Sequence, residues 1–507
     1  MAKELFDGIY SSHKVVFIER IEKNLQFYLR EKIKKIKKSG QEIIVDIEKD
    51  DLDSTISELK NNPEFGVEIL GSINYILSGR QSYLLLSMSS ISNNFSMVLK
   101  VKIESGPENM DNLKKEFHGI LEIIGEHYPI AGFFKEERSF RQYFNDVIIK
   151  GQVPDGLDCF DSYIVSGYGE IEKIFIDGRI SAIPAEDIFC NIEFERLLTI
   201  VSRLDFSAGI FPEIGLCLAL EEILQLKVSK RAQLIRMLVC ELFRITNHLY
   251  FISKIAKIAG SEFSFNRALI ERDRAMRLTE LITGARIHPN FSRIGGVRQN
   301  INEEKILNIK KNMKILLHKV DNLETIFLDN TLITAKLKNS GIIRKETALK
   351  FGLSGPNLRS CGVRYDLRKN RNLLLYKDIS FLVPFGKFGD CLERLQIRFN
   401  EIYQSIKIIQ QITDSLPDET IRKLDSIENF EIDRTEAVSS IECPHGVYKL
   451  FIEIENNKIL NLVPVAPSLN NLFCAREILA GNNIEDFNLI LASLDISSGE
   501  MLQGHYL

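Results

Sequence analysis

Tryptophan is absent from this sequence of 507 residues, and its eight cysteines are scattered. The two nearest in sequence, Cys217 and Cys240, are 240 − 217 = 23 residues apart. Without a CxxC or CxxH pair, the sequence offers neither a zinc ribbon nor a redox dithiol. Free, buried thiols in a reducing compartment are the simplest interpretation of the cysteines.

The sequence also lacks an excess of charge of either sign and any long apolar run. Lys and Arg number 65 and Asp and Glu number 69, so the net charge is 65 − 69 = −4, which argues against a chain-wide nucleic-acid surface. No stretch approaches the roughly 18 apolar residues of a transmembrane helix. The first twenty residues have no secretory apolar segment, so we expect a cytoplasmic chain.

What is present is the composition of a globular protein, with 45% hydrophobic and 26% charged residues. At about 150 residues per domain, the length predicts roughly three domains, or two of which one is large. The first 150 residues predict a small α/β domain with helices on one antiparallel sheet. The predicted helices are 17–38, 51–62 and 113–125, and the predicted strands are 41–47, 66–77, 81–90 and 94–103.

Residues 151–162 are turn-rich and are predicted to be a linker to a larger domain, 163–507. This domain begins with two short strands, 163–166 and 171–176, and becomes mainly helical from residue 194. Residues 230–259 are apolar on nearly all faces, which is typical of a helix in a bundle core. Asn456 and Asn457 predict the turn of a hairpin over 446–462. The expected fold class is α+β: a small sheet domain, then a large helical bundle domain with small peripheral sheets.

Seven short motifs occur in order along the second domain. They are SRLDF at 202–206, RAQLIR at 231–236, ELFRITNHL at 241–249, RIHPNFSRIGGV at 286–297, LRSCGVRYDLR at 358–368, VPFGKFGD at 383–390 and ASLD at 492–495. Together they resemble the 49 kDa-type (D) subunit of respiratory complex I, which is related to the large subunit of membrane-bound NiFe hydrogenases. The first domain resembles the 30 kDa-type (C) subunit in pattern. The whole chain therefore resembles a fused C–D subunit.

The resemblance implies a peripheral-arm subunit of an NADH-quinone oxidoreductase, inactive alone and active only within its complex. It implies a cytoplasmic-side position on the inner (plasma) membrane, with an Fe–S small subunit and membrane-arm subunits as partners and no nucleic acid. The 4Fe–4S cluster is expected in the neighbouring small subunit, with no cofactor held by this chain's own ligands. Quinone is the expected substrate, and this chain would form a wall of its pocket.

By the same resemblance, Arg203 and His248 occupy the positions that face the cluster. A cation or an N–H donor near cluster sulfurs stabilises the reduced state. The alternatives are that Arg203 pairs with Asp205 or a helix end, and that His248 is a satisfied core histidine.

The quinone side departs from the family, which protonates quinone from a tyrosine and a histidine held by an aspartate. The tyrosine position falls on Phe206, the aspartate position on Ile258, and the histidine turn reads SGYG at 166–169. Tyr168 is the candidate replacement proton donor, although it also suits a turn aromatic packed on the core. Tyr168, Phe206 and Ile258 are expected to line the quinone cavity.

A NiFe centre is not expected, because it requires two CxxC-type pairs and residues 495–500 stand where the second pair would be. The changed quinone positions support a second hypothesis, a non-catalytic or repurposed hydrogenase-related large subunit that scaffolds an ion-translocating membrane complex.

A basic cluster is expected at the surface, where it would face a neighbouring subunit or anionic lipid, or would simply be solvated. Its members are Arg359, Arg364, Arg368 and Lys369.

Overall fold

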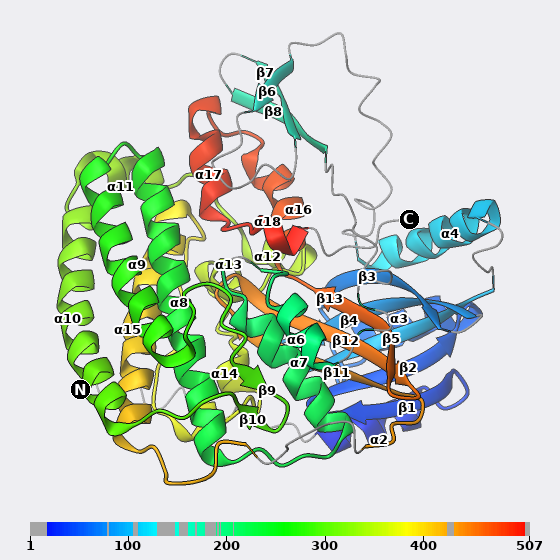
Figure 1. The fold of residues 1–507 in the computed structure, drawn as a ribbon. Helices are drawn as coiled ribbons and strands as arrows, with labels where there is room; N and C mark the ends of the chain where they lie inside the picture. Colours follow the sequence, from blue (N-terminus) through cyan, green and yellow to red (C-terminus); the bar gives the residue numbers. More distant parts are fainter. Residues whose placement is uncertain are drawn as a thin grey trace, which may run out of the picture.

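The computed structural model describes residues 18–501 apart from 79–80, 105–109, 129–147, 152–160, 168–169, 178–188, 190–191, 193, 206 and 423–429. Within these residues, a sheet domain packs beside a helical bundle, with a second antiparallel sheet between them (Figure 1). This arrangement confirms the expected α+β fold class. The predicted linker falls mostly on residues 152–160, which lie outside the described residues.

The N-terminal sheet has five strands in the order β1-β2-β5-β4-β3. The strands are β1 (Ile33–Ser39), β2 (Glu42–Glu48), β3 (Ile69–Ser78), β4 (Gln81–Ser90) and β5 (Phe95–Ile103). The sheet is mixed, because β2 and β5 run parallel while the other neighbours are antiparallel. The expectation of an antiparallel sheet was wrong for this one pair. A crossover through α3 (Leu52–Asn61) and the β3–β4 hairpin separates β2 from β5 and permits the parallel pairing.

The predicted helix over 17–38 is divided between α2 (Ile18–Tyr28) and β1. Ile33 and Ile36 are three residues apart, a helical spacing, yet both pack against the core. An irregularity in the β1–β2 register between Ile33 and Lys35 brings the two side chains to one face. The lysines of β1 suit the edge of the sheet.

Helices cover one face of this sheet. Ile43, Val45 and Ile47 of β2 point into the core shared with α2, α3 and α4 (Met110–His127), whereas Ile44 points to the opposite face. Both faces of β2 are therefore buried, which explains its nearly continuous apolar run.

The second sheet covers the other face. It comprises β11 (Thr435–Cys443), β12 (Gly446–Glu455) and β13 (Lys458–Val465). The predicted hairpin is confirmed, with Asn456 and Asn457 at φ of 50° and 60° in its turn; strand β11 was not predicted. A separate apolar cluster between the two sheets, which we call the seam, contains Ile44, Ile76, Leu85, Val98, Val438, Phe451 and Val463.

The helical bundle is built from α8 (Lys230–Ile258), α9 (Glu262–Thr283), α10 (Glu303–Leu328) and α15 (Cys391–Asp414) (Figure 1). Ser229 caps the N-terminus of helix α8, because its hydroxyl accepts a hydrogen bond from the Ala232 amide. It is buried on nearly all faces, as predicted. No helix among the described residues is long and apolar enough to cross a bilayer.

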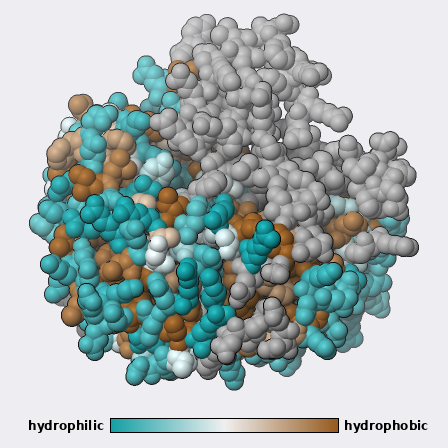
Figure 2. Space-filling model, in the orientation of Figure 1, coloured by the Kyte–Doolittle hydropathy of each residue, from teal (hydrophilic) through white to brown (hydrophobic). Residues whose placement is uncertain are grey.

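Shorter elements connect these parts. They are β6 (Ile148–Gly151), β7 (Asp161–Gly167), β8 (Glu170–Asp177), α6 (Phe194–Val201), α7 (Ile210–Ile223), β9 (Ser292–Arg293), β10 (Gly296–Val297), α11 (Thr331–Leu337), α12 (Lys345–Lys350), α13 (Gly355–Ser360), α14 (Leu367–Asn370), α16 (Ser468–Leu479), α17 (Phe487–Ser493) and α18 (Ser498–Met501). Helix α7 packs beneath β11 and β12, on the side of that sheet away from the seam. On the face shown in Figure 2, hydrophilic and hydrophobic side chains are interspersed over the described residues.

Candidate functional site

The turn between α6 and α7 places two polar side chains side by side. Asp205 Oδ1 accepts hydrogen bonds from the Ser207 amide at 2.9 Å, the Ser207 hydroxyl at 2.8 Å and the Ser497 hydroxyl at 3.1 Å. A Cβ at Gly209 would lie 2.2 Å from the Ser202 carbonyl oxygen, so only glycine permits this tight turn. Asp205 is buried, whereas Ser207 is half-buried.

His445 enters the same site from the turn between β11 and β12. Its Nε2 lies 2.9 Å from Ser207 Oγ, and its Nδ1 lies 3.0 Å from the Asp495 carbonyl oxygen and 3.2 Å from Asp495 Oδ2. The next residue, Gly446, has φ of 146°, a conformation that side chains other than glycine rarely adopt. Because both partners of Nδ1 are acceptors, Nδ1 carries a hydrogen and Nε2 is the nitrogen that can exchange a proton with Ser207.

The C-terminal segment supplies the carboxylates of the site. Asp495 adopts a left-handed backbone with φ of 54° and also pairs with Lys254 at 3.2 Å and Arg398 at 3.6 Å. Glu500 accepts hydrogen bonds from the amide and the hydroxyl of Ser468. A non-glycine residue in the conformation of Asp495 is strained and persists only where its surroundings hold it.

Burial and charge set opposite protonation tendencies in this cluster. Burial opposes the charged form of His445, but the carboxylates of Asp495, Glu500 and Asp205 outweigh it and raise the pKa of His445 to about 9. Burial raises the pKa of Glu500 to about 7, despite the opposing effect of His445. At neutral pH the cluster therefore holds an imidazolium beside a carboxyl group that titrates near pH 7.

Asp205, His445 and Glu500 each offer one possible metal-ligand atom, all within 4.8 Å of one another. Both nitrogens of His445 are already hydrogen-bonded, and a protonated imidazole cannot ligate a metal. The six described cysteines are buried and free, and none forms a pair. We therefore assign no metal ligand here.

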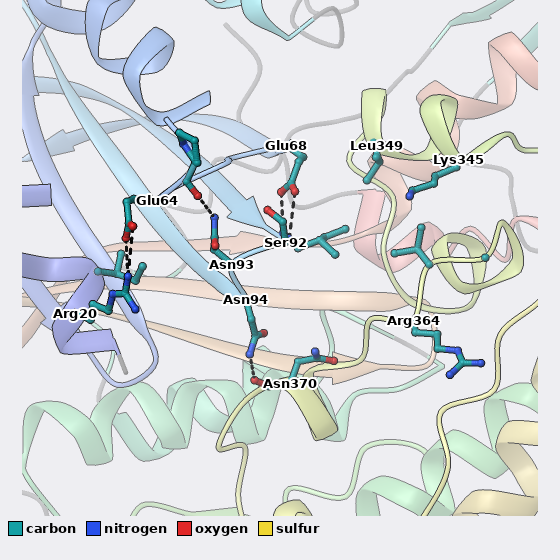
Figure 3. Close-up of a pocket in the computed structure, with 15 residues that line it drawn as sticks. Arg20, Glu64, Glu68, Ser92, Asn93, Asn94, Lys345, Leu349, Arg364 and Asn370 are labelled. Atoms are coloured by element: carbon teal, nitrogen blue, oxygen red, sulfur yellow. Dashed lines mark hydrogen bonds and ion pairs between the residues drawn. The ribbon is translucent and has the colours of Figure 1, made fainter. Parts of the chain in front are cut away.

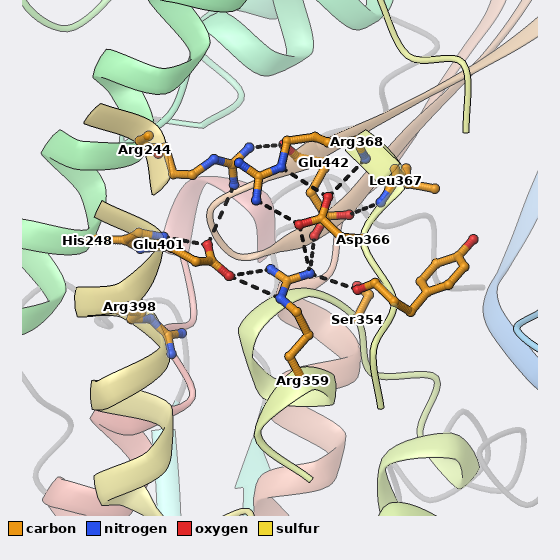
Figure 4. A network of polar contacts seen from close by, with 12 residues as sticks. Arg244, His248, Ser354, Arg359, Asp366, Leu367, Arg368, Arg398, Glu401 and Glu442 are labelled. Atoms are coloured by element: carbon orange, nitrogen blue, oxygen red, sulfur yellow. Dashed lines mark hydrogen bonds and ion pairs between the residues drawn. The ribbon is translucent and has the colours of Figure 1, made fainter. Parts of the chain in front are cut away.

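A second buried cluster lies between α8, α13 and α15 (Figure 4). Arg359 donates to Glu401 Oε1 at 2.6 Å and to Glu442 Oε1 at 2.8 Å, and Arg368 donates to Asp366 Oδ2 at 2.7 Å. The members of this ionic network are Glu241, Arg244, His248, Arg359, Asp366, Arg368, Arg398, Glu401 and Glu442, all essentially inaccessible to solvent. Four arginines face four carboxylates, so the network is nearly neutral, as burial requires.

His248 belongs to this network. It is 0% exposed, and its Nε2 lies 2.8 Å from Glu401 Oε2. Burial lowers the pKa of His248 to about 4 despite Glu401, so the neutral ring donates from Nε2, and Nδ1 has no hydrogen-bond partner. These contacts favour the alternative of a core histidine. Its role toward a cluster in another chain stays a prediction, and its burial limits that role to an indirect one.

Arg203 lies elsewhere, exposed at the end of α6, where its guanidinium donates to the Thr199 carbonyl oxygen. Arg203 is thus exposed, whereas His248 is buried. His288 reaches this turn, with Nδ1 3.0 Å from the Ser202 carbonyl oxygen, and its side chain is half-buried. The RIHPNF motif contained His288, but nothing in its spacing indicated this contact.

The predicted lining of the quinone cavity stays a prediction. Tyr168 and Phe206 lie outside the described residues. Ile258 is the last residue of α8, half-buried and packed against the main core, with no ionisable group to contribute.

The predicted surface basic cluster was wrong for two of its four members. Arg359 and Arg368 are buried because the carboxylates of the ionic network neutralise them. Arg364 is exposed and lies over the Phe385 ring at 3.6 Å, and Lys369 lies over the Phe381 ring at 4.1 Å. The sequence showed the arginines but not their partners, which are up to 127 residues away.

A separate cavity of about 600 Å³ opens where the N-terminal domain meets the helical domain (Figure 3). Glu64, Glu68 and Asn93 line it from one side, and Lys345 and Arg364 from the other. None of the predicted site residues lines it. The Asn94 side chain donates to the Asn370 carbonyl oxygen at 2.5 Å and thereby links the two domains beside the cavity.

Sequence reasoning missed His445, Ser207 and Glu500 as one site. The only available signal was the CPHG turn at 443–446, in a chain with eight histidines. Asp205 and His445 are 240 residues apart, and nothing in the sequence indicated their contact.

The comparisons with known proteins agree with this architecture. Residues 259–502 match the family model of the 49 kDa subunit of respiratory-chain NADH dehydrogenase. The D-type subunit of NADH-quinone oxidoreductase from Desulforamulus reducens is 35% identical over 338 residues, which is 64% of this chain and 92% of that protein. The H-type subunit of NAD(P)H-quinone oxidoreductase from Synechococcus sp. is 32% identical over 62% of this chain and 86% of that protein. The D-type subunit from Rickettsia canadensis is 30% identical over 59% of this chain and 83% of that protein.

The fold and the matches define a subunit of the respiratory NADH dehydrogenase class. The chain belongs to the family of the 49 kDa-type (D) subunits of NADH-quinone oxidoreductases.

Proposed function

We propose that this chain is a fused C–D subunit in the peripheral arm of an NADH-quinone oxidoreductase, where it forms one wall of the quinone pocket. The match over 92% of a D-type subunit carries this proposal. The chain would work with an Fe–S small subunit and with membrane-arm subunits, on the cytoplasmic side of the inner (plasma) membrane. The older relationship to NiFe hydrogenase large subunits belongs to the same proposal.

Polar contacts beside the seam, between the N-terminal sheet and the second sheet, support the fusion. Lys100 of β5 pairs with Glu436 of β11 at 2.9 Å, and Lys449 of β12 donates to Ser87 of β4 at 2.8 Å. Lys100 and Glu436 form a buried ion pair across the interface, and separating the two domains would leave each charge without its partner, which is strongly destabilising.

The 4Fe–4S cluster would be held by the neighbouring subunit and would supply the electrons for quinone reduction. This chain would supply no cysteine ligand to that cluster; its six described cysteines are buried and form no disulfide. From this chain, the exposed Arg203 and the half-buried His288 beside its turn would influence such a cluster electrostatically. Buried His248 would act only through Glu401.

The experiment is inhibitor-sensitive NADH:quinone reduction by the purified complex that contains this chain. We expect turnover that a quinone-site inhibitor abolishes. As a second readout, His288→Gln is expected to lower the midpoint potential of the cluster in an electron paramagnetic resonance titration, whereas His248→Gln shifts it less. No inhibitor-sensitive turnover from a complex whose clusters are reduced by NADH would contradict the proposal.

The second candidate is a non-catalytic scaffold that joins a peripheral arm to an ion-translocating membrane module. The observation that favours it is Ile258, an apolar residue packed on the core where the family carries an aspartate. The same assay separates the two functions, because a scaffold complex would assemble and yet reduce no quinone.

A further inference from the structure

The His445 cluster has a feature that the ionic network lacks: one of its members reaches toward the surface. His445, Asp205, Asp495 and Glu500 are each at most 3% exposed, whereas Ser207 is half-buried. Ser207 directly follows position 206, where the family carries its proton-donating tyrosine and this chain carries phenylalanine.

We propose that His445, oriented by Asp495, supplies the protons for quinone reduction through the hydroxyl of Ser207. This inference rests on the quinone reduction proposed above and assigns the proton route that Phe206 and Ile258 cannot provide. Ser207 would touch the quinone oxygen, and His445 would act through Ser207.

The geometry orders three groups in a line. The Asp495 carbonyl oxygen accepts a hydrogen bond from Nδ1–H at 3.0 Å, and Asp495 Oδ2 forms an ion pair with Nδ1 at 3.2 Å, so Nε2 points to Ser207 Oγ at 2.9 Å. The Ser207 hydroxyl in turn lies 2.8 Å from Asp205 Oδ1. A carboxylate, an imidazole and a hydroxyl in this order can pass a proton between Nε2 and the hydroxyl oxygen.

The side-chain amide of Asn247 lies beside this line. Asn247 Oδ1 is buried without a hydrogen-bond partner, and the Asn247 amide nitrogen lies 3.3 Å from His445 Nε2. An amide nitrogen and a protonated Nε2 cannot bond each other, because both are donors. Rotating the Asn247 amide would let its oxygen accept from the imidazolium.

The charges that face His445 come from every neighbouring element. Asp205 lies on the α6–α7 turn, Lys254 on α8 and Arg398 on α15, while Asp495 and Glu500 lie on the C-terminal segment. Cys443 and Tyr448, of the hairpin that carries His445, have a pKa raised by burial and stay neutral. Three carboxyl groups near one imidazole favour its protonated form, which agrees with the raised pKa of His445.

Quinone takes two electrons from the neighbouring subunit's cluster, with NADH as the reductant, and two protons through this chain. For each proton, the Nε2–H bond of His445 and the Oγ–H bond of Ser207 break while new O–H bonds form on Ser207 and on the quinone oxygen. The neutral imidazole then regains a proton from solvent through Glu500, which has a carboxylate oxygen within 4.8 Å of a His445 nitrogen and a pKa of about 7.

The test uses the purified complex with the variants His445→Gln, Ser207→Ala and Ser207→Thr. His127→Gln is the matched control, because His127 pairs with Asp53 at 2.8 Å in the N-terminal domain, away from this cluster. General acid catalysis contributes about 10²- to 10⁴-fold, so we expect His445→Gln to slow quinone reduction at least 100-fold. Ser207→Ala should slow it comparably, and Ser207→Thr, which keeps the hydroxyl, should restore most of the rate.

Four further readouts separate a proton route from a structural role. Reduction of the clusters by NADH and binding of a quinone-site inhibitor should stay within about threefold of the unmodified complex. The rate of the unmodified complex should fall as the pH rises through about 9, and His445→Gln should lose this limb. The redox-difference infrared spectrum should show imidazolium bands that disappear in His445→Gln.

The possible contrary results distinguish failure of the proton route from failure of the proposed function. If the unmodified complex reduces quinone and His445→Gln does so equally fast, the proton route is wrong and the proposed function stands. If the unmodified complex reduces its clusters but no quinone, both fall. One equivalent of metal retained by the purified chain and lost in His445→Gln would also overturn the route, since a metal-bound imidazole holds no exchangeable Nε2 proton.

Discussion

Two fully buried histidines of this chain, His248 and His445, have opposite protonation states at neutral pH. His248 has one carboxylate, Glu401, which Arg359 already neutralises, and burial lowers its pKa to about 4. His445 faces three carboxyl groups and its pKa is raised to about 9. Burial alone therefore does not decide the charge of a histidine; the balance of neighbouring charges does.

This difference predicts how stability depends on pH. The folded chain binds the His445 proton more tightly than the unfolded chain, so its stabilising contribution is complete below pH 6.5 and is lost as the pH rises toward about 9. A rise of the pKa from 6.5 to about 9 corresponds to about 3 kcal/mol. The free energy of unfolding, measured between pH 6.5 and 9, should fall more steeply for the unmodified chain than for His445→Gln. Parallel curves for the two proteins would contradict the assignment.

Glu401 predicts a large cost at a single residue. Glu401→Gln leaves Arg359 short of an anionic partner in the ionic network, and breaking a buried ion pair costs about 3–5 kcal/mol. Thermal or denaturant unfolding measures this loss. Glu477→Gln is the matched control, because its pair with Lys350 is more than one-third exposed, and such a pair contributes about 1 kcal/mol or less. Equal effects of the two substitutions would contradict the network's role.

The sequence located elements better than it located partners. Strand β4 and the hairpin turn at Asn456 and Asn457 were predicted from apolar alternation and turn residues. The helix predicted over 17–38 was confirmed as α2 over its first half and was wrong over β1, where a register irregularity gives a strand the spacing of a helix. Strand β11 was missed because its sequence, TEAVSSIEC, lacks a clear apolar alternation.

The β12–β13 turn allows a test of this element. Asn456 is exposed and has φ of 50°, a conformation that β-branched residues avoid. Asn456→Val should destabilise the chain by about 1–2 kcal/mol, whereas Asn456→Gly should change stability by less than about 1 kcal/mol. Denaturant unfolding distinguishes them, and a neutral valine substitution would show that the turn tolerates another conformation.

For the whole molecule, the class of fold followed from the sequence, but the docking of its two sheets did not. The seam joins residues such as Ile44 and Val438, which are almost four hundred positions apart, and no local pattern encodes that pairing. The same holds for the candidate site: the motifs pointed to the turn that contains Asp205 and Ser207, but His445 joins that turn only in three dimensions.

The seam predicts a coupling between the domains. Lys100→Met leaves Glu436 buried beside an apolar side chain and should cost about 3–5 kcal/mol. The double variant Lys100→Met/Glu436→Met should recover much of this loss, because it removes both charges together. A double-mutant cycle by denaturant unfolding measures the interaction, and strictly additive effects would show that the two charges are not coupled.

Because both sheets of the seam belong to one polypeptide, their encounter is intramolecular. A tether replaces the bulk concentration of a separate partner with an effective concentration that stays constant when the protein is dilute. Because the two domains are parts of one polypeptide, they are always synthesised in a one-to-one ratio. Neither domain is then present without the other, so the apolar sheet face that each would otherwise expose is covered and does not cause aggregation. Assembly of the larger complex then begins from a unit in which this junction is already made.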